Sequence, residues 1–209
     1  MASAAVPTVY IIDDDVRVRA SIQGLLKSAG LHSIGFETAE QFWREEATDC
    51  PSCLILDVSL PGINGLDFQQ QLRSAGRLIP IIFITGHGDI PMSVKAIKSG
   101  ALEFLTKPFG DQDLLNAVEQ ALARDLISRR KHAEINALEK RYDDLTHREK
   151  EVMEFVISGM LNKQIAAELG ITERTIKVHR ARVMHKMHAG SLAELVLMRV
   201  KLRHVHAKE

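Results

Sequence analysis

The chain has 209 residues, of which 45% are hydrophobic and 26% charged, and its 27 basic and 27 acidic residues give a formal net charge of zero. This composition is typical of a globular protein and excludes a generally disordered chain. No apolar run approaches the ~20 residues of a membrane span, Met1–Pro7 lacks the basic residue of a secretory signal, and two cysteines are too few for a disulfide scaffold, so we expect a soluble, cytoplasmic protein without a membrane partner.

The first half of the chain alternates between short apolar runs and segments in which apolar residues have helical spacing. Strands are predicted at 9–12, 32–36, 53–56, 81–84 and 101–105, and helices at 16–29, 39–46, 66–74 and 91–99. Because the runs are apolar throughout, the strands should be buried on both faces, as in a parallel sheet. We therefore predict a doubly wound α/β fold, with a five-stranded parallel sheet and helices on both of its faces.

Residues 111–145 contain no Gly or Pro and continue the helical pattern. Four apolar side chains between Ile135 and Leu145 follow one another by three or four residues, which is heptad spacing. One interpretation is a long helix that leaves the first domain as a semi-rigid linker. The other is a helix that ends near Ser128 and continues as a flexible, charged linker. The sequence leaves both open, because helix propensity is a weak guide.

The remainder of the chain predicts four helices. Thr146–Glu149 and Ser191–Glu194 each have a Ser or Thr followed three residues later by Glu, the capping-box pattern that starts a helix. Between them, Asn162 should cap a short helix that Gly170 ends, and Thr172 should cap a longer one. We therefore predict an all-α domain of four helices with a tight turn between the middle two.

The zero net charge divides unevenly along the chain. Residues 1–124 carry a net charge of −5, residues 125–145 a net charge of zero, and residues 146–209 a net charge of +5. Opposite charges in two halves indicate different partners, a metal ion for the acidic half and nucleic acid for the basic half. We therefore expect a first domain over 1–124, a helical linker over 125–145 and a second domain over 146–209.

The carboxyl ends of the predicted strands, where open parallel sheets bind ligands, carry a set of polar side chains. Asp13 and Asp14 follow the first strand, Asp57 the third, Thr85 the fourth and Lys107 the fifth. Carboxylates this close repel one another unless a cation lies among them, and oxygen ligands suit Mg²⁺. A carboxylate beside Mg²⁺ can attack a phosphoryl group, while the lysine and the hydroxyl stabilise the phosphoryl oxygens.

Acidic residues at the start of a helix are also common as caps, because they favour the helix dipole. That explanation suffices for Asp15, but it does not account for Asp57 and Lys107 at matching strand ends. The set as a whole therefore indicates a site for phosphoryl chemistry.

Residues 7–124 resemble the receiver domain of two-component response regulators, whose fold is flavodoxin-like. The resemblance rests on Val9–Asp14, Leu54–Asp57 with Pro61-Gly62, Ile84–Gly86 and Leu105–Phe109. It implies that Asp57 accepts phosphate from a histidine kinase. It also implies that Asp14, Asp57 and the backbone carbonyl of Ser59 hold Mg²⁺ (or Mn²⁺), with Asp13 close by.

The same resemblance assigns three further residues. Thr85 matches the switch hydroxyl and Lys107 the phosphate-binding lysine, and Phe104 occupies the aromatic switch position three residues before that lysine. Relatives usually have a cis peptide bond after this lysine, so Lys107–Pro108 is a candidate.

Lys163–Leu169, the turn at Gly170 and Glu173–Met187 resemble a helix-turn-helix, whose last helix would enter the major groove of DNA. Ile176, Val183 and Met187 lie on one stripe of that helix and should pack inward. The other faces are basic and polar, which suits contacts to phosphates and bases.

Residues 145–203 as a whole resemble the LuxR-type DNA-binding domain. The resemblance rests on Leu145-Thr146, Arg148-Glu149, Glu151-Val152, Gly159, Asn162–Ala166, Leu169–Ile171 and Thr175–His179. It implies base contacts from Lys177, Val178 and Ala181, although Ala181 is small for such a role. It implies phosphate contacts from Lys163, Thr172, Thr175, His179 and Arg182. The segment Ser191–Leu202 matches the helix through which relatives pair on DNA.

Within response regulators, Gly86–Met92 and Lys177–Arg180 indicate the FixJ-like subgroup. That resemblance implies a transcription regulator, typically an activator, that dimerises on phosphorylation through a face near Pro91–Leu105. Its partners would be a histidine kinase, double-stranded operator DNA and RNA polymerase. Its chemistry would be limited to phosphorylation and dephosphorylation of its own Asp57, so we do not expect an enzyme.

Three alternatives are weaker. An aspartyl-phosphate hydrolase often has a second Asp two residues after the nucleophile, where this chain has Ser59. A flavodoxin-like cofactor binder needs a phosphate loop after the first strand, where Asp13–Asp15 would repel phosphate. A regulator that works without phosphorylation would not need the complete set, which is Asp13, Asp14, Asp57, Thr85 and Lys107.

Overall fold

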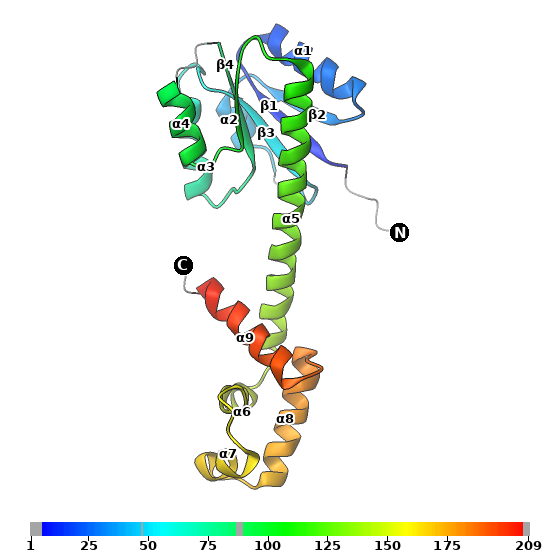
Figure 1. The fold of residues 1–209 in the computed structure, drawn as a ribbon, viewed down its shortest axis with the longest axis vertical. Coiled ribbons are helices and arrows are strands. Elements are labelled where there is room, and N and C mark those ends of the chain that lie inside the picture. Colours follow the sequence, from blue (N-terminus) through cyan, green and yellow to red (C-terminus); the bar gives the residue numbers. More distant parts are fainter. Residues whose placement is uncertain (1–5, 47, 87–89, 207–209) are drawn as a thin grey trace. The chain divides into compact units, whose positions relative to one another are not determined.

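The computed structural model describes residues 6–46, 48–86 and 90–206. The chain divides into two compact units, Met1–Arg129 and Arg130–Glu209, and Figure 1 labels most of their elements. The first unit contains a β-sheet with its helices, and the second is helical. In the part of the chain that the structure describes, no helix is both long and apolar enough to cross a membrane.

Five strands form the sheet of the first unit: β1 (Thr8–Ile12), β2 (His32–Phe36), β3 (Ser52–Asp57), β4 (Ile81–Thr85) and β5 (Glu103–Thr106). They pair in parallel in the order β2-β1-β3-β4-β5. The strands β1, β3 and β4 are buried along their whole length, which explains why their sequences are apolar on both faces. The predicted five-stranded, doubly wound fold is confirmed.

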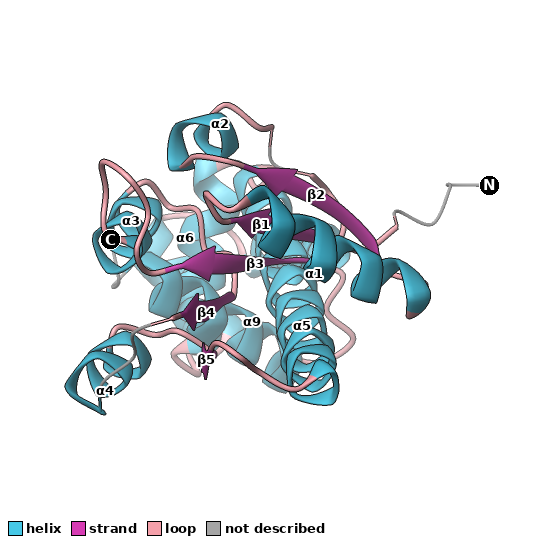
Figure 2. Ribbon diagram, turned by 90° about the horizontal axis from the view of Figure 1, so that it is seen from above, coloured by secondary structure: helices cyan, strands magenta, loops and turns pink. Residues whose placement is uncertain are grey.

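The helices of this unit are α1 (Val16–Ser28), α2 (Ala39–Trp43), α3 (Gly65–Ser74), α4 (Ile90–Lys98) and the start of α5 (Asp111–Asp143). In Figure 2, α1 and α5 lie on one face of the sheet, and α2, α3 and α4 lie on the other. Leu26 of α1 and Leu114 of α5 share one core with Ile55 of β3. Phe68 of α3 shares the other with Leu56, the next residue of the same strand. Successive residues of β3 thus serve opposite cores.

Helix α2 is shorter than the predicted 39–46. It ends at Trp43, and just beyond this end the Arg77 side chain donates a hydrogen bond to the backbone carbonyl of Glu45 (2.8 Å). The same guanidinium lies over the ring of Trp43, 5.5 Å from its centroid. Contacts from a distant loop thus hold the residues at the end of this helix, and nothing in the local sequence signals them.

Strand β5 begins later than the predicted 101–105. The N–H of Ala101 bonds to the carbonyl of Ala96 (3.1 Å), so this residue closes the end of α4, and the strand starts at Glu103. At the other end of β5, the Lys107–Pro108 peptide bond is cis, as predicted.

The second unit packs the last turns of α5 with α6 (His147–Ile157), α7 (Asn162–Leu169), α8 (Glu173–Met187) and α9 (Leu192–His206). Its core includes Ile176, Val183 and Met187 of α8, which confirms the predicted inward stripe. Thr146 and Glu149 form the predicted capping box. Four helices after residue 146 are therefore present as the sequence predicted.

The cap of α7 is a correction. Asn162 is the first residue of this helix, not the residue that caps it. Its side-chain oxygen accepts a hydrogen bond from Arg180 instead (3.1 Å), and the Gln164 side chain accepts from the N–H of Leu161 (2.8 Å). Gly170 ends the helix with a positive φ of 65°, as predicted.

Helix α5 runs without interruption from Asp111 to Asp143, which is the first of the two alternatives for the linker. The apolar side chains in its last turns pack into the core of the second unit and do not form a coiled coil within the described structure. Leu138 is buried in that unit's core together with Leu145 beyond the end of the helix, and Tyr142 packs against them.

Candidate functional site

The carboxyl ends of β1 and β3 bring three carboxylates together. Asp13 and Asp14 directly follow β1, and Asp57 is the last residue of β3. One carboxylate oxygen from each lies within 4.8 Å of the others. Asp13 and Asp57 are buried, whereas Asp14 is exposed. The cluster is therefore open to solvent at Asp14, and the rest of the domain covers Asp13 and Asp57.

Lys107 connects the two buried carboxylates. Its Nζ donates hydrogen bonds to Asp13 Oδ2 (2.6 Å) and Asp57 Oδ2 (2.7 Å). The remaining oxygens bond to nearby backbone, Asp13 Oδ1 to the N–H of Asp15 and Asp57 Oδ1 to the N–H of Ser59 (both 2.9 Å). Each carboxylate is thus held in a fixed orientation by one lysine and one backbone donor.

Burial and these hydrogen bonds set the acidity of the cluster. Burial raises the pKa of Asp13 above its ordinary value, although hydrogen bonds from Lys107 and the Asp15 N–H oppose it. Burial alone would lower the pKa of Lys107, but hydrogen bonds to Asp13 and Asp57 outweigh it, so the pKa is raised. Lys107 therefore remains a cation beside the acidic residues.

Thr85 and Phe104 lie on the neighbouring strands. Thr85 ends β4 and is fully buried, and its carbonyl accepts a hydrogen bond from the N–H of Lys107 (2.7 Å). It directly follows Ile84, the residue that pairs with Asp57 across the strands. Phe104 is partly buried in β5, with its ring 6.4 Å from that of Phe83. Thr85 and Lys107 therefore lie together at the carboxyl end of the sheet, whereas Phe104 pairs with Phe83, two residues before Thr85.

Sequence reasoning missed a close contact at Gly65. A Cβ atom on this first residue of α3 would lie only 2.5 Å from the backbone oxygen of Asp57. The sequence does not reveal this contact, because a glycine can be needed for other reasons. Gly62, for example, has a positive φ of 84° in the loop after β3. Arg19 was missed as well, and its Nη1 donates to the backbone oxygen of Asp13 (2.6 Å).

The loop after β4 contributed to the predicted subgroup through Gly86–Met92. Residues 87–89 of that stretch lie outside the described residues. Met92 of α4 packs against the core that Phe104 also contacts.

The second unit presents its predicted DNA-binding residues along α7 and α8. Lys163 lies in the first turn of α7 and is exposed. On α8, Lys177, Val178, Ala181 and Arg182 are exposed. They are spaced by one, three or four residues, so they share one side of the helix. This exposed side is opposite the apolar stripe that packs into the core.

The other predicted residues of this helix are Thr172, which is exposed, and Thr175 and His179, which are partly buried. Thr172 caps α8, accepting from the N–H of Thr175 (3.2 Å), and the two hydroxyls are 2.9 Å apart. His179 is half-buried, and its Nδ1 has no hydrogen-bond partner among the residues described. Its ring therefore has one nitrogen covered by protein.

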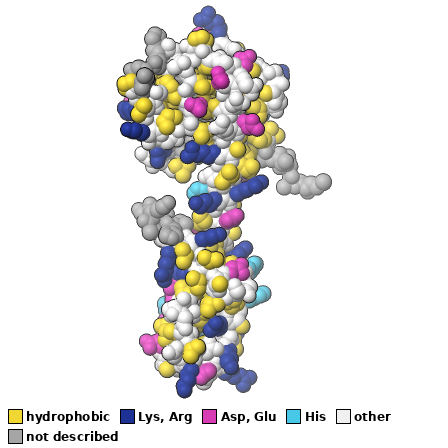
Figure 3. Space-filling view, viewed as in Figure 1, with side chains coloured by type: hydrophobic (Ala, Val, Ile, Leu, Met, Phe, Trp, Pro, Cys, Tyr) yellow, Lys and Arg dark blue, Asp and Glu magenta, His cyan; other side chains and the backbone are white. Residues whose placement is uncertain are grey.

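Ion pairs separate the basic residues of this unit into two groups. Lys186 pairs with buried Glu149 (2.7 Å), and Arg199 and Arg203 both pair with Glu154. These cations stabilise the helices. In contrast, Lys163, Lys177 and Arg182 make no ion pair with any residue in the described ranges. Lys and Arg side chains project from the end formed by α7 and the start of α8 (Figure 3).

The two sites have different chemistry. The carboxylate cluster offers hard oxygen ligands of the kind that bind a divalent cation, with Asp57 as a nucleophile and Lys107 as a neighbouring cation. The exposed side of α8 offers unpaired cations on a helix, which suits a polyanion.

Two family models match the chain. Residues 9–119 match the model described as "Response regulator receiver domain", and residues 143–199 match "Bacterial regulatory proteins, luxR family". Together they cover both units.

Relatives with similar length carry both segments. Nodulation protein W of Bradyrhizobium diazoefficiens is 47% identical over 91% of this chain and 84% of its own length. Transcriptional regulatory protein FixJ of Azorhizobium caulinodans is 42% identical over 91% of this chain and 90% of its own. The solved structure of response regulator StyR is 46% identical, with a TM-score of 0.86 over 94% of this chain and all of its own.

Proposed function

The chain belongs to the response regulators of two-component systems, with a receiver domain and a LuxR-type DNA-binding domain, and we propose that Asp57 is its phosphoacceptor. Such a protein is a transcription regulator with a kinase partner, not a classical enzyme. The observation that carries the proposal is the convergence of Asp13, Asp14 and Lys107 on the Asp57 carboxylate. We propose domain limits of 1–124 and 146–209, with 125–145 as linker.

In the proposed step, a carboxylate oxygen of Asp57 attacks the phosphorus of a phosphohistidine on the kinase. A P–O bond forms as the P–N bond breaks, and the electron pair of that bond returns to the histidine nitrogen. Lys107 transfers a hydrogen bond from the carboxylates to an oxygen of the phosphoryl group, and the Thr85 hydroxyl donates to another. The chain then hydrolyses its own acyl phosphate and turns over no external substrate.

The carboxylate cluster suits a divalent cation. Three carboxylates with oxygens within 4.8 Å of one another, one of them exposed, form a donor set for Mg²⁺ or Mn²⁺. Asp14, Asp57 and the backbone carbonyl of Ser59 would hold the ion, with Asp13 beside it. When bound, the ion offsets negative charge on the phosphoryl oxygens.

The output of the phosphorylated receiver is proposed to be a dimer on DNA. Phosphate on Asp57 shifts Thr85 and Phe104, and this exposes a face near Pro91–Leu105 for pairing with a second copy. Paired recognition helices then fit a two-fold operator. The protein would act in the cytoplasm as an activator that recruits RNA polymerase.

The DNA contacts are proposed from α7 and α8. Base edges would be read by Lys177, Val178 and Ala181, which are exposed on one side of α8. Phosphates would be bound by Lys163, Thr172, Thr175, His179 and Arg182. The unpaired state of the three exposed cations supports this assignment.

Acetyl phosphate tests the phosphoacceptor directly. The full chain incubated with this small phosphodonor and Mg²⁺ should gain the mass of one phosphoryl group by intact mass spectrometry. Asp57→Asn should remain unmodified, and chelation of the metal with EDTA should stop the reaction. Asp67→Asn, which alters an exposed acid in the first turn of α3, is the matched control and should be modified as the parent is. Equal modification of Asp57→Asn would refute the proposal.

A further inference from the structure

A cavity lies at the edge of the receiver sheet opposite Asp57. Its volume is about 230 Å³, and it lies where Pro80 and Leu102 lead into β4 and β5, with α3 and α5 as side walls. Since the strands are parallel and Asp57 ends β3, the cavity is at the amino ends of the strands.

Three arginines from separate segments line this cavity: Arg73 of α3, Arg77 of the following loop and Arg124 of α5. Arg73 and Arg77 donate to the backbone carbonyls of Ser99 and Glu45, and the Arg77 guanidinium also lies over the Trp43 ring. Arg124 is exposed and makes no hydrogen bond or ion pair to any residue that the structure describes. None of the three is matched by a carboxylate within those residues.

The acidic lining residue does not offset these charges. Asp125 also lines the cavity, but its Oδ2 accepts from the Ser52 N–H (2.8 Å) and from Arg129. That carboxylate is therefore already neutralised by a fourth arginine. A concentration of positive charge remains, in a domain whose net charge is −5 over residues 1–124.

Gln69 supplies a second, independent observation. Gln69 is only 2% exposed and lines the same cavity, and its Oε1 has no hydrogen-bond partner among the described residues. Buried acceptors without a donor are rare because they lose their hydrogen bonds to water. A donor is therefore missing at the wall of a cavity lined by cations.

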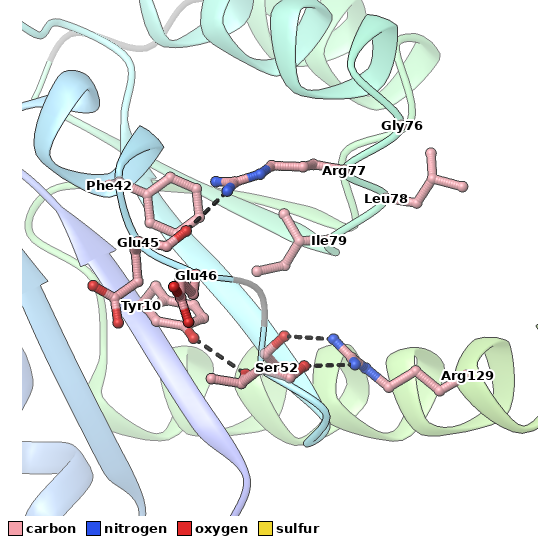
Figure 4. A pocket seen from close by; sticks show the side chains of 11 residues that line it. Tyr10, Phe42, Glu45, Glu46, Ser52, Gly76, Arg77, Leu78, Ile79 and Arg129 are labelled. Carbon is pink, nitrogen blue, oxygen red and sulfur yellow. Dashed lines mark hydrogen bonds between the residues drawn. The ribbon is translucent and has the colours of Figure 1, made fainter.

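A neighbouring cavity of about 220 Å³ differs in this respect (Figure 4). There the polar side chains have hydrogen-bond partners: Tyr10 bonds to Thr48 (3.2 Å), and Arg77, which lines both cavities, bonds to the backbone carbonyl of Glu45. Arg129 reaches the Thr48 carbonyl (2.8 Å) and the Ser52 hydroxyl (3.2 Å). These bonds hold the walls of the neighbouring cavity together. In the first cavity, Arg124 and Gln69 Oε1 have no such partner among the described residues.

We propose that the cavity beside Gln69 and Arg124 binds a small anion that carries a hydroxyl group. Guanidinium groups match the planar carboxylate and the phosphate group in geometry and charge. A hydroxyl next to the anionic group donates to Gln69 Oε1 after a small movement of that side chain. Hydroxycarboxylates and phosphate monoesters of polyols share this chemistry. The ligand would join α3 to α5 within the receiver and stabilise it by mass action.

Titration of the ¹⁵N-labelled full chain with malate, succinate and glycerol phosphate, followed by NMR at constant ionic strength, tests the proposal. Malate and succinate differ by one hydroxyl, and glycerol phosphate separates a phosphate source from a carboxylate source. We expect a dissociation constant of about 1 mM or tighter for malate or glycerol phosphate. We also expect succinate to bind about tenfold more weakly than malate, because it leaves Gln69 unpaired.

Arg124→Ala should weaken binding about tenfold without affecting the fold, because its side chain is exposed and unpaired in the described structure. Arg44→Ala, an exposed arginine after α2 and outside the cavity, is the matched control and should bind as the parent does. Failure of both malate and glycerol phosphate to bind would overturn the proposal. Unchanged affinity in Arg124→Ala would overturn the site, and equal affinity for malate and succinate would overturn the role of Gln69.

Discussion

At the scale of single residues, Gly65 is constrained by the backbone of Asp57, the proposed phosphoacceptor. A Cβ at this position would meet the Asp57 carbonyl at 2.5 Å and the Val58 Cα at 3.0 Å, both of them backbone atoms that cannot rotate away. The loop after β3 and the start of α3 must therefore pack without a side chain here. Local geometry around Asp57 depends on this glycine.

Gly65→Ala should destabilise the first unit by about 1–3 kcal/mol, the usual cost of forcing an extra carbon into a packed region. Urea unfolding followed by fluorescence of Trp43, the one tryptophan of the sequence, measures this. Gly24→Ala in α1 is the control, since its Cβ would meet nothing within 4 Å. It should stabilise the helix by about 0.5–1 kcal/mol. Equal stability of the two variants would contradict the account.

A second residue-scale prediction concerns pH and Glu149. Burial would raise its pKa, but the hydrogen bonds from Lys186 and Thr146 outweigh this, so the pKa is lowered from the usual 4.5. A carboxylate with a lowered folded pKa adds stability above its unfolded pKa, and that stability is lost as the pH falls through the folded value. Glu149→Gln should therefore be less stable than the parent near pH ~7, and the difference should narrow below pH ~4.

Urea unfolding at each pH measures this difference. Far-ultraviolet circular dichroism follows the loss of helix, and Trp43 fluorescence identifies the part of that transition that belongs to the first unit. Glu168→Gln is the matched control, because Glu168 is exposed and unpaired in the described structure. A parent-to-variant difference that is constant with pH would show that the Glu149 ion pair with Lys186 does not contribute as described.

The sequence predicted the residues of the carboxylate cluster because strand order and strand ends decide their positions. Asp13, Asp57 and Lys107 each follow an apolar run, and parallel pairing brings such ends together. Gly65 and Arg19 could not be predicted, since their roles come from contacts with backbone atoms in three dimensions. The sequence alone does not distinguish a glycine that packs against a carbonyl from a glycine in a turn.

At the scale of elements, α5 is anchored to the start of β3. Asp125 is 3% exposed and accepts from the N–H of Ser52, the first residue of β3, while Arg129 bonds to Asp125 and to the Thr48 carbonyl. The strand whose other end carries Asp57 is thus fixed to the helix that continues toward the second unit.

Arg129→Ala should destabilise the first unit by about 2–3 kcal/mol, because it leaves the Asp125 carboxylate buried without its cation. The loss should be smaller than for a fully buried ion pair, because the Arg129 side chain is 35% exposed and water screens its charge. Trp43 fluorescence in urea again reports the loss. Arg130→Ala, at an exposed position without a partner in the described structure, should change stability by less than about 0.5 kcal/mol. Similar losses in both variants would refute the anchor.

Element boundaries followed from the sequence where the cause is local. The Thr146 box and the Gly170 ending were predictable because capping residues act within a few positions. The contact of Arg77 at the end of α2 was not, because Arg77 lies 32 residues from the carbonyl that it binds. The cap expected at Asn162 failed for a related reason, since its side chain bonds to Arg180 on another helix.

At the scale of the whole molecule, the zero net charge combines an acidic receiver and a basic output domain. The two domains are expected to respond differently to salt, because DNA binding releases counterions whereas phosphoryl transfer at a buried carboxylate does not. Lys177 and Arg182 lie on the same exposed side of α8 but are proposed to contact different parts of DNA.

Lys177→Ala should weaken specific binding by about 1–3 kcal/mol and leave binding to unrelated duplex little changed. Arg182→Ala should weaken both kinds of binding and reduce the slope of log affinity against log salt by about one. Fluorescence anisotropy over a salt series measures both, with Lys140→Ala, an exposed lysine of α5, as the control. Identical behaviour of Lys177→Ala and Arg182→Ala would contradict the division between base and phosphate contacts.

The central claim is that phosphate on Asp57 controls DNA binding, and one titration tests it most directly. A duplex is selected from a random pool by the phosphorylated full chain, and its affinity is measured with and without acetyl phosphate and Mg²⁺. The parent protein should bind more tightly when phosphorylated, and Asp57→Asn should bind with the same, weaker affinity in both conditions. Equal affinity of the parent protein with and without phosphorylation would contradict the account.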